Sequence, residues 1–304
     1  MRIGIFNGTV NDGTVDRMVE EAKQVEAAGF ATFWAPQIFG HDALTALAVV
    51  AREVPRVELG TSVVPTFPRH PMALAQQALT VNEISGGRLT LGIGLSHQPV
   101  VEGIWGMSFD KPVRHMREYL ASMMPLLEHG SVRFSGEVFT TRGDLSIRIG
   151  DRPGVVVAAL GEQMLRVAAQ YADGTLTWCT GPETLRTHTI PTLRAAAESA
   201  GRDAARVIAA LPVCVTSDVA SAQERAAAVF EIYGQLPSYR AMLDREGASG
   251  PADIVIAGTA QECADRIGAL GDIGVSDFAA VEFSADPGEA AATREMLVSL
   301  IESP

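Results

Sequence analysis

Residues 57–95, VELGTSVVPTFPRHPMALAQQALTVNEISGGRLTLGIGL, contain the pattern that decides the fold. The run from Val57 to Val64 is short, apolar and rich in β-branched residues, which predicts a buried strand. A stretch with one apolar helix face follows it and ends before Gly86-Gly87. The run from Leu89 to Leu95 predicts a second buried strand. A strand, a helix and a strand in this order are typical of parallel α/β architecture.

The same alternation of strand and helix continues along the whole chain. The predicted strands are almost entirely apolar, as in a parallel sheet that is buried on both faces. They cover Ile3–Phe6, Ala31–Ala35, Val57–Val64, Leu89–Leu95, Val155–Ala159, Thr175–Trp178, Val207–Val215 and Phe278–Phe283. Eight strands, each followed by a helix, predict an α/β fold of the (β/α)8 TIM-barrel class. The alternative is a doubly wound open sheet, which the lack of a G-x-G-x-x-G motif after the first strand disfavours as a dinucleotide-binding fold.

Two stretches interrupt the alternation and are predicted to be insertions after the fourth and seventh strands. Residues 131–149 contain short alternating runs that predict a small hairpin. Residues 221–272 are predicted to be mainly helical, with a long helical region over about 221–245 and another helix over about 261–270. We therefore expect a single TIM-barrel domain over residues 1–304.

Charge and hydropathy exclude several functional classes. The chain has 24 basic and 36 acidic side chains, a formal charge of −12, and its only lysines are Lys23 and Lys111. Such a surface is poorly suited to nucleic acid, whose binding depends on Lys and Arg at the phosphates. No stretch approaches the roughly 18 apolar residues of a membrane span, and the apolar run at the start is too short for a signal peptide. We expect a cytoplasmic protein without nucleic-acid or membrane partners.

The cysteines do not form a recognisable metal or disulfide pattern. Cys179, Cys214 and Cys263 are odd in number, far apart and outside any CxxC spacing. We interpret them as buried or unreactive thiols of a reducing compartment, and no metal site is predicted.

Four segments near the predicted strand ends resemble one family. They are residues 59–71, 86–94 and 155–161, with Ala172-Asp173-Gly174 after the next helix. Together and in this order they are similar to the luciferase-like monooxygenase superfamily, specifically to its branch that uses the deazaflavin coenzyme F420. The similarity covers essentially the whole chain. It implies a TIM barrel that binds coenzyme F420, with FMN as the alternative cofactor, and a homodimer.

The resemblance also implies which residues hold the cofactor. In this family the end of the third strand contains a non-prolyl cis peptide behind the cofactor ring, by position at Ser62-Val63 or Val63-Val64. The implied contact residues are Thr61, Ser62, Val63, Val64, Gly94, Leu95, Ser96, Ala159, Leu160, Gly161, Glu162 and Gln163. The free N–H groups that begin the helix at Glu162 suit a phosphate, and Gly161 permits its close approach. The alternative is an ordinary turn between strand and helix.

His97, Gln37 and His41 are the candidate catalytic residues. His97 follows the fourth strand, and an imidazole that titrates near neutrality suits proton donation to a substrate; the alternative is a solvated loop histidine. Sugar-phosphate dehydrogenases of this family have Asp-His where this chain has Pro36-Gln37. The usual acid/base histidine is therefore missing unless His41 replaces it, and a sugar-phosphate substrate is disfavoured.

The rim of the predicted pocket is expected to select a small-molecule substrate. It comprises about residues 99–110 and 231–252, with Trp105 and Trp178 as candidate walls and Glu282 as a possible interior acid. The leading hypothesis is an oxidoreductase that transfers a hydride between coenzyme F420 and a small organic substrate. The alternatives are an FMN-dependent monooxygenase of the same superfamily and a barrel that binds a flavin or deazaflavin without turnover.

Overall fold

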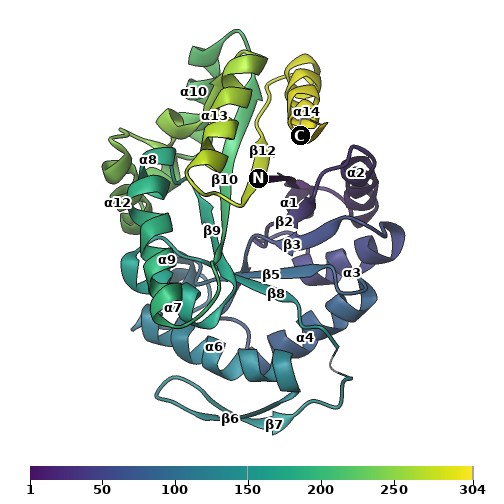
Figure 1. The fold of residues 1–304 in the computed structure, drawn as a ribbon, viewed down its shortest axis with the longest axis vertical. Helices are drawn as coiled ribbons and strands as arrows, with labels where there is room; N and C mark the ends of the chain where they lie inside the picture. Colours follow the sequence, from purple (N-terminus) through teal and green to yellow (C-terminus); the bar gives the residue numbers. More distant parts are fainter. Residues whose placement is uncertain (149, 303–304) are drawn as a thin grey trace.

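The computed structural model describes residues 1–148 and 150–302 of the chain, and in it eight parallel strands form a closed ring (Figure 1). The barrel strands are β1 Arg2–Phe6, β2 Thr32–Ala35, β3 Glu58–Thr61, β5 Leu89–Gly94, β8 Gly154–Ala158, β9 Gly174–Trp178, β10 Arg206–Val215 and β12 Asp277–Glu282. Each strand pairs with the next, and β12 pairs with β1, which closes the ring. The prediction of a TIM barrel is confirmed, and the open sheet is excluded.

Helices cover the outside of the ring. They are α1 Thr9–Asp12, α2 Val15–Ala27, α3 Ala43–Glu53, α4 Pro71–Ile84, α5 Gln98–Gly103, α6 Pro112–His129, α7 Glu162–Tyr171, α8 Pro182–Thr184, α9 Ile190–Ser199, α13 Ala260–Asp272 and α14 Pro287–Glu302, with a π-helical turn, Leu185–Thr189, between α8 and α9. Local chemistry fixes their ends. Asp42 Oδ1 accepts the N–H of Thr45 at 2.9 Å and starts α3, whereas Gly130, at φ 72°, ends α6 in the left-handed conformation that glycine adopts freely.

The N-terminal end of the barrel interior is filled by an ion-pair network. Arg206, on β10, donates to Glu58 Oε1 at 2.8 Å and to Asp277 Oδ1 at 2.7 Å. The hydrogen bonds and charges of these two carboxylates raise the pKa of the Arg206 guanidinium against the opposing effect of burial, so the group stays ionised. Because this end lies away from the loops that form barrel active sites, the network serves stability.

Above the ion pairs, an apolar layer fills the barrel. The indole of Trp34 is fully buried, and a Cβ added to Gly60 would lie only 2.1 Å from its Cε3. Only glycine at position 60 leaves room for the ring. Phe6, Val63 and Trp178 pack on the same cluster and mark its boundary with the cavity described below.

The first insertion is an antiparallel hairpin, β6 Ser131–Ser135 and β7 Thr140–Asp144, outside the ring beside α4 and α6 (Figure 1). Glu118, on α6, holds its turn: the carboxylate accepts the N–H groups of Glu137 at 3.1 Å, Val138 at 2.7 Å and Phe139 at 3.0 Å. Residue 149, the last of the predicted insertion, lies outside the described residues.

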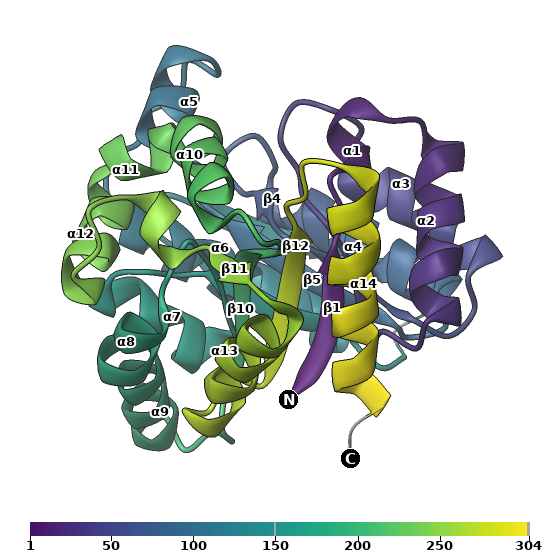
Figure 2. The ribbon, with the colours of Figure 1, turned by 90° about the horizontal axis from the view of Figure 1, so that it is seen from above.

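The helical region predicted over about 221–245 consists of several short helices rather than a continuous one. Three helices occur there, α10 Val219–Val229, α11 Glu231–Gln235 and α12 Pro237–Glu246, followed by the 3-10 turn Pro251–Ile254 and a short strand, β11 Ile256–Gly258, beside β10. Leu236 is extended because the next residue is a proline, which disfavours helical geometry at the residue before it. Figure 2 shows α10 and α11 near α5 at the end of the barrel away from both termini. A single domain over residues 1–304 stays a prediction.

The third predicted strand is also divided. β3 ends at Thr61, and a two-residue strand, β4 Val64–Pro65, pairs with β5 beyond the break. The peptide bond between Ser62 and Val63 is cis, at one of the two positions that the resemblance implied.

Candidate functional site

A cavity of about 570 Å³ opens at the C-terminal ends of the barrel strands. Strand ends form its floor, and the loops after β2, β5 and β8 form its sides, with α11 and α12 from the second insertion. Its lining comprises Phe6, Pro36, Gln37, Ile38, Phe39, Ser62, Val63, Pro65, Gly94, Leu95, Ser96, His97, Val100, Trp105, Phe109, Pro112, Ala158, Ala159, Leu160, Gly161, Met164, Leu176, Trp178, Phe230, Tyr233, Ser238, Tyr239 and Val281. This is the end of a TIM barrel where active sites occur.

The cavity is apolar and carries no formal charge. Among the described residues that line it, none is Asp, Glu, Lys or Arg, and eight are Phe, Tyr or Trp. Two of these end barrel strands, Phe6 and Trp178, and six come from the loops and insertions above: Phe39, Trp105, Phe109, Phe230, Tyr233 and Tyr239. Aromatic rings of this kind suit a flat, largely apolar ligand.

The break between β3 and β4 forms one wall of the cavity. Ser62 and Val63 line it, whereas Thr61 and Val64 do not. Thr61 Oγ1 instead accepts the N–H of Gly92 at 2.9 Å and donates to its carbonyl at 2.8 Å, while Val64 is buried in the core. Thr61 and Val64 are therefore structural supports rather than direct contacts.

A polar atom in the same wall lacks a partner. Ser62 Oγ is buried and makes no hydrogen bond to any other part of the chain that the structure describes. Buried hydroxyls are almost always hydrogen-bonded. Of the described hydroxyls without a partner, that of Ser62 is the one that belongs to a residue lining the cavity. Gly94 lies against Val63 in the same wall, since an added Cβ would lie 2.7 Å from Val63 Cγ2. Only glycine at position 94 leaves room for the Val63 side chain to pack against this part of the backbone.

The loop before α7 provides an opposite wall. Ala159, Leu160 and Gly161 line the cavity, and the carbonyl of Leu160 accepts a hydrogen bond from His188 Nε2 at 2.9 Å. No side chain caps the N-terminus of α7, so its first N–H groups are free for a ligand. Gly161 has φ −75° and ψ 152°, which any residue adopts, and an added Cβ would meet no atom within 4 Å. Neither backbone conformation nor packing requires glycine here.

The resemblance implied that Glu162 and Gln163 contact the cofactor, but neither residue lines the cavity. The Glu162 side chain is paired with Arg166 at 2.5 Å, one turn along the exposed face of α7. Gln163 lines a separate, open hollow beside α6. Both side chains point away from the cavity because they lie on the outer face of the first helical turn.

His97 lies in the cavity wall among aromatic rings. Its ring centroid is 6.2 Å from that of Tyr233 and 5.7 Å from that of Tyr239, both edge-on. Burial lowers the pKa of His97 below its usual value, so the imidazole is neutral at pH 7. Burial raises the pKa of both tyrosines, which therefore remain protonated. A neutral imidazole beside two neutral phenols can accept one proton and then return it.

Sequence reasoning missed Tyr233 and Tyr239 as individual residues. They belong to the predicted rim, residues 231–252, which the structure places over the cavity, but no spacing or motif distinguishes them from packing residues. Trp105 and Trp178 line the cavity as expected.

The other acid/base candidates have different positions. Gln37 lines the cavity, but its Oε1 accepts the N–H of Ala43 at 2.7 Å, and an amide does not titrate. His41 is exposed and donates to the carbonyl of Gly13 at 3.0 Å, outside the cavity, so it does not replace the missing histidine. Glu282 is not an interior acid, because its carboxylate is paired with Arg294 on α14.

Comparison with known proteins places this architecture in a family. The model of the luciferase-like monooxygenase family matches residues 1–277. The chain belongs to the luciferase-like monooxygenase family. The protein is thus an enzyme of the luciferase-like class, and the predicted resemblance is confirmed.

Similar members of the luciferase-like family include proteins named for coenzyme F420 or for a pterin reductase. A putative coenzyme F420-dependent oxidoreductase of Mycobacterium tuberculosis is 30% identical over 269 residues, covering 84% of this chain and 76% of that protein. The 5,10-methylenetetrahydromethanopterin reductase of Methanolobus tindarius is 27% identical over 294 residues, covering 87% of this chain and 89% of that protein. The solved structure of the coenzyme F420-dependent tetrahydromethanopterin reductase of Methanopyrus kandleri has a TM-score of 0.82 at 22% identity. The match covers 98% of this chain and 97% of that protein.

All three cysteines are buried and unpaired with one another, as predicted. Burial raises the pKa of Cys179 and brings that of Cys214 to about 11, so neither is a thiolate at pH 7. Within the described residues, no helix is long and apolar enough to cross a membrane.

Proposed function

We propose that the protein transfers a hydride between coenzyme F420 and a small, uncharged organic substrate. The observation that carries this proposal is the uncharged, aromatic cavity at the strand ends of a luciferase-like barrel. The names of similar family members support coenzyme F420 as the cofactor, because they include an F420-dependent oxidoreductase and an F420-dependent reductase.

The residues present fit a deazaflavin ring and its phosphate. Ser62 and Val63 form a flat wall with Gly94, Leu95 and Ser96 beside it, and the unpartnered Ser62 Oγ is placed for a polar ring atom. Ala159, Leu160 and Gly161 would hold the ribityl phosphate at the uncapped start of α7. When bound, the deazaflavin supplies two-electron hydride chemistry at its ring.

His97 is the proposed proton-transfer residue. Its imidazole reaches the cavity, is neutral at pH 7 and, within the described residues, has no hydrogen bond to another side chain. As a neutral base it can accept a proton from an alcohol during oxidation, and in the reverse reaction its protonated form returns that proton to the carbonyl oxygen. Tyr233 and Tyr239 position the ring and exclude water. Gln37 positions the loop that leads into α3, and it does not act as an acid or a base.

The substrate class follows from the lining of the cavity. A charged substrate would lose its hydration there without gaining an ion-pair partner, which costs several kcal/mol. Two of the lining residues are exposed apolar side chains, Ile38 at 53% and Phe39 at 64%. An apolar ketone, alcohol or alkene of small size matches both features better than a sugar phosphate.

The proposal is tested by comparing two cofactors in a fluorescence titration. Tight binding of coenzyme F420, with hydride transfer to a panel of uncharged ketones or enones, is the expected result. No tight F420 binding, together with oxygen consumption in the presence of reduced FMN, would establish the alternative of an FMN-dependent monooxygenase. Tight F420 binding without hydride transfer to any substrate would support a non-catalytic binding barrel.

We further propose that the protein is a cytoplasmic homodimer whose partners are small molecules. The lack of a membrane-spanning helix among the described residues and the −12 charge are consistent with this proposal. Light scattering coupled to size-exclusion chromatography will measure the mass, and a monomer at micromolar concentration would refute the dimer.

A further inference from the structure

Within the described residues, the uncharged cavity has no cation for the carboxylates of the cofactor proposed above. Coenzyme F420 continues beyond its ring and ribityl phosphate into a chain that carries carboxylates. Carboxylates buried without cations or hydrogen-bond donors are strongly disfavoured, and no described lining residue is Lys or Arg. The carboxylate chain must therefore leave the cavity and find its cations elsewhere.

A second hollow adjoins the cavity beside the start of α7, where we place the ribityl phosphate. It has a volume of about 500 Å³ and is lined by Lys111, Pro112, Val113, Arg114, Arg117 and Gln163. Pro112 lines both spaces, and Gly161 of the cavity is only two residues before Gln163 of the hollow. The two spaces thus meet between the starts of α6 and α7.

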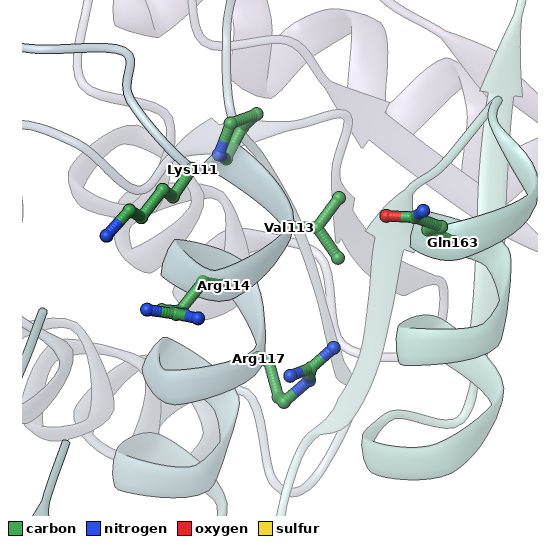
Figure 3. A pocket seen from close by; sticks show the side chains of 6 residues that line it. Lys111, Val113, Arg114, Arg117 and Gln163 are labelled. Atoms are coloured by element: carbon green, nitrogen blue, oxygen red, sulfur yellow. The ribbon is translucent and has the colours of Figure 1, made fainter. Parts of the chain in front are cut away.

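Figure 3 shows how these side chains are arranged. Arg117 and Val113 extend from α6 toward α7, and Gln163 extends back toward them. Lys111 and Arg114 extend along the other side of the start of α6. The hollow therefore receives Arg117 from α6 and Gln163 from α7, and two further cations lie at its edge.

The cations of the hollow are only partly neutralised. Arg114 is paired with Glu137, and Lys111 Nζ lies 3.6 Å from the same carboxylate. Glu118, the nearby acid on α6, is ionised but uses its oxygens for three N–H groups of the hairpin turn. Arg117 makes no hydrogen bond or ion pair with another described residue.

The position of these cations is itself unfavourable without an anion. The first turn of α6 contains no acidic residue, and the positive end of a helix dipole repels Lys and Arg. Lys111 also has φ 51°, a left-handed conformation that non-glycine residues rarely adopt, directly before Pro112. In a protein of net charge −12 with two lysines, this cluster is an exception to the overall charge pattern.

We propose that Arg117 and Gln163, assisted by Lys111 and Arg114, bind the carboxylate chain of coenzyme F420 outside the cavity. The proposal rests on the proposed cofactor and extends it: the ring occupies the cavity, the phosphate the start of α7, and the carboxylates the hollow beside α6. Arginine suits this task because its planar guanidinium binds a carboxylate through two parallel hydrogen bonds.

Two variants and one matched control test the proposal. Arg117→Gln and the double variant Lys111→Gln/Arg117→Gln remove positive charge without breaking the pair between Arg114 and Glu137. Arg52→Gln removes an exposed arginine from the last turn of α3, at the opposite end of the barrel. Each protein is titrated with coenzyme F420, with its deazariboflavin core, which lacks phosphate and carboxylates, and with FMN, which has a phosphate only.

The expected result is selective. The Kd for coenzyme F420 should rise about tenfold in Arg117→Gln and further in the double variant, with a weaker dependence on salt concentration. The Kd values for the core and for FMN should stay within about twofold, as should all values for Arg52→Gln. Equal losses for F420 and FMN would place the phosphate, not the carboxylates, in the hollow and overturn the proposal. An unchanged F420 Kd, or equal losses for all three ligands, would also overturn it.

Failure of the cofactor assignment gives a different result. If the unmodified protein binds FMN but neither deazaflavin ligand, the proposed function fails, and with it the role of the hollow as a site for this carboxylate chain. If the unmodified protein binds F420 and its core equally tightly, the cofactor assignment stands, and the proposed contact with the chain is refuted.

Discussion

Replacing Gly161 with valine separates ligand binding from folding more cleanly than any other change in the site. An added Cβ at this position meets no atom within 4 Å, and the backbone angles of φ −75° and ψ 152° are open to any residue. Packing therefore gives no reason for the variant to unfold. Valine is a poorer N-cap than glycine, which costs up to about 1 kcal/mol. For a chain of this length, that corresponds to a fall of about 2–4 °C in Tm.

The effect on the cofactor should be larger. The new side chain would stand in front of the uncapped N–H groups of α7, which we assign to the ribityl phosphate. Loss of one hydrogen bond to a charged group corresponds to about 1.5–3 kcal/mol, or roughly a 10- to 150-fold rise in the Kd of coenzyme F420. FMN, which has the same phosphate, should lose a comparable factor, whereas the phosphate-free deazariboflavin core should lose much less.

The assay is fluorescence quenching, with Tm measured on the same samples. Gly268→Val is the matched control, because Gly268 also has no atom within 4 Å of an added Cβ but lies in α13, away from the cavity. Gly161→Ser provides a better N-cap and separates helix stability from ligand contact. A Gly161→Val protein with a normal Tm and an F420 Kd within twofold of the unmodified value would refute the phosphate assignment.

Three further predictions concern other parts of the molecule. His97→Ala should lower kcat by about 100-fold or more, with a cofactor affinity that changes by no more than a few-fold. Because the pKa of His97 is lowered, oxidation of an alcohol, which needs the neutral imidazole, should slow only below about pH 6.5 in the unmodified enzyme. Unaltered turnover in the variant would remove the residue from the mechanism. Arg206→Met leaves two buried carboxylates, Glu58 and Asp277, without their main partner and should destabilise the fold by about 3–5 kcal/mol in urea titrations, whereas a loss below about 1 kcal/mol would show that the network is dispensable. His115 is 4% exposed with a pKa lowered to about 4, so the unfolded state binds the extra proton first, and stability should fall by about 3 kcal/mol as pH drops from about 6.5 to 4; His115→Phe should reduce this dependence, and an identical pH profile in the variant would contradict it.

Much of the fold was predictable because its signals are local. Each barrel strand is a short apolar run, and the sequence places all eight within a few residues of their structural bounds. The alternation of strand and helix then leaves few topologies, because parallel strands need a crossover and the crossover has one preferred hand. The backbone segments of the cavity follow from the same rule, since barrel sites form at the C-terminal strand ends.

Individual side chains at the site were less predictable. Within residues 61–64, Ser62 and Val63 line the cavity. Thr61 instead makes hydrogen bonds to the backbone of Gly92, and Val64 is buried in the core. Which of these side chains reaches the cavity depends on how β3 and β4 pair with β5, and those pairings join residues that are distant in sequence. The same limit applies to His41, whose hydrogen bond is made to a loop 28 residues earlier in the chain.

The sequence by itself determined the architecture, the family and the loops that form the site, because apolar periodicity and short motifs are properties of neighbouring residues. Only the tertiary structure decided which side chains line the cavity. It brought Tyr233 and Tyr239 to His97 from an insertion more than 130 residues away along the chain, and it placed Arg117 and Gln163 around one hollow. The physical reason is that such contacts arise from helix packing around a closed barrel, which depends on the whole chain at once and leaves no periodic signal in any segment.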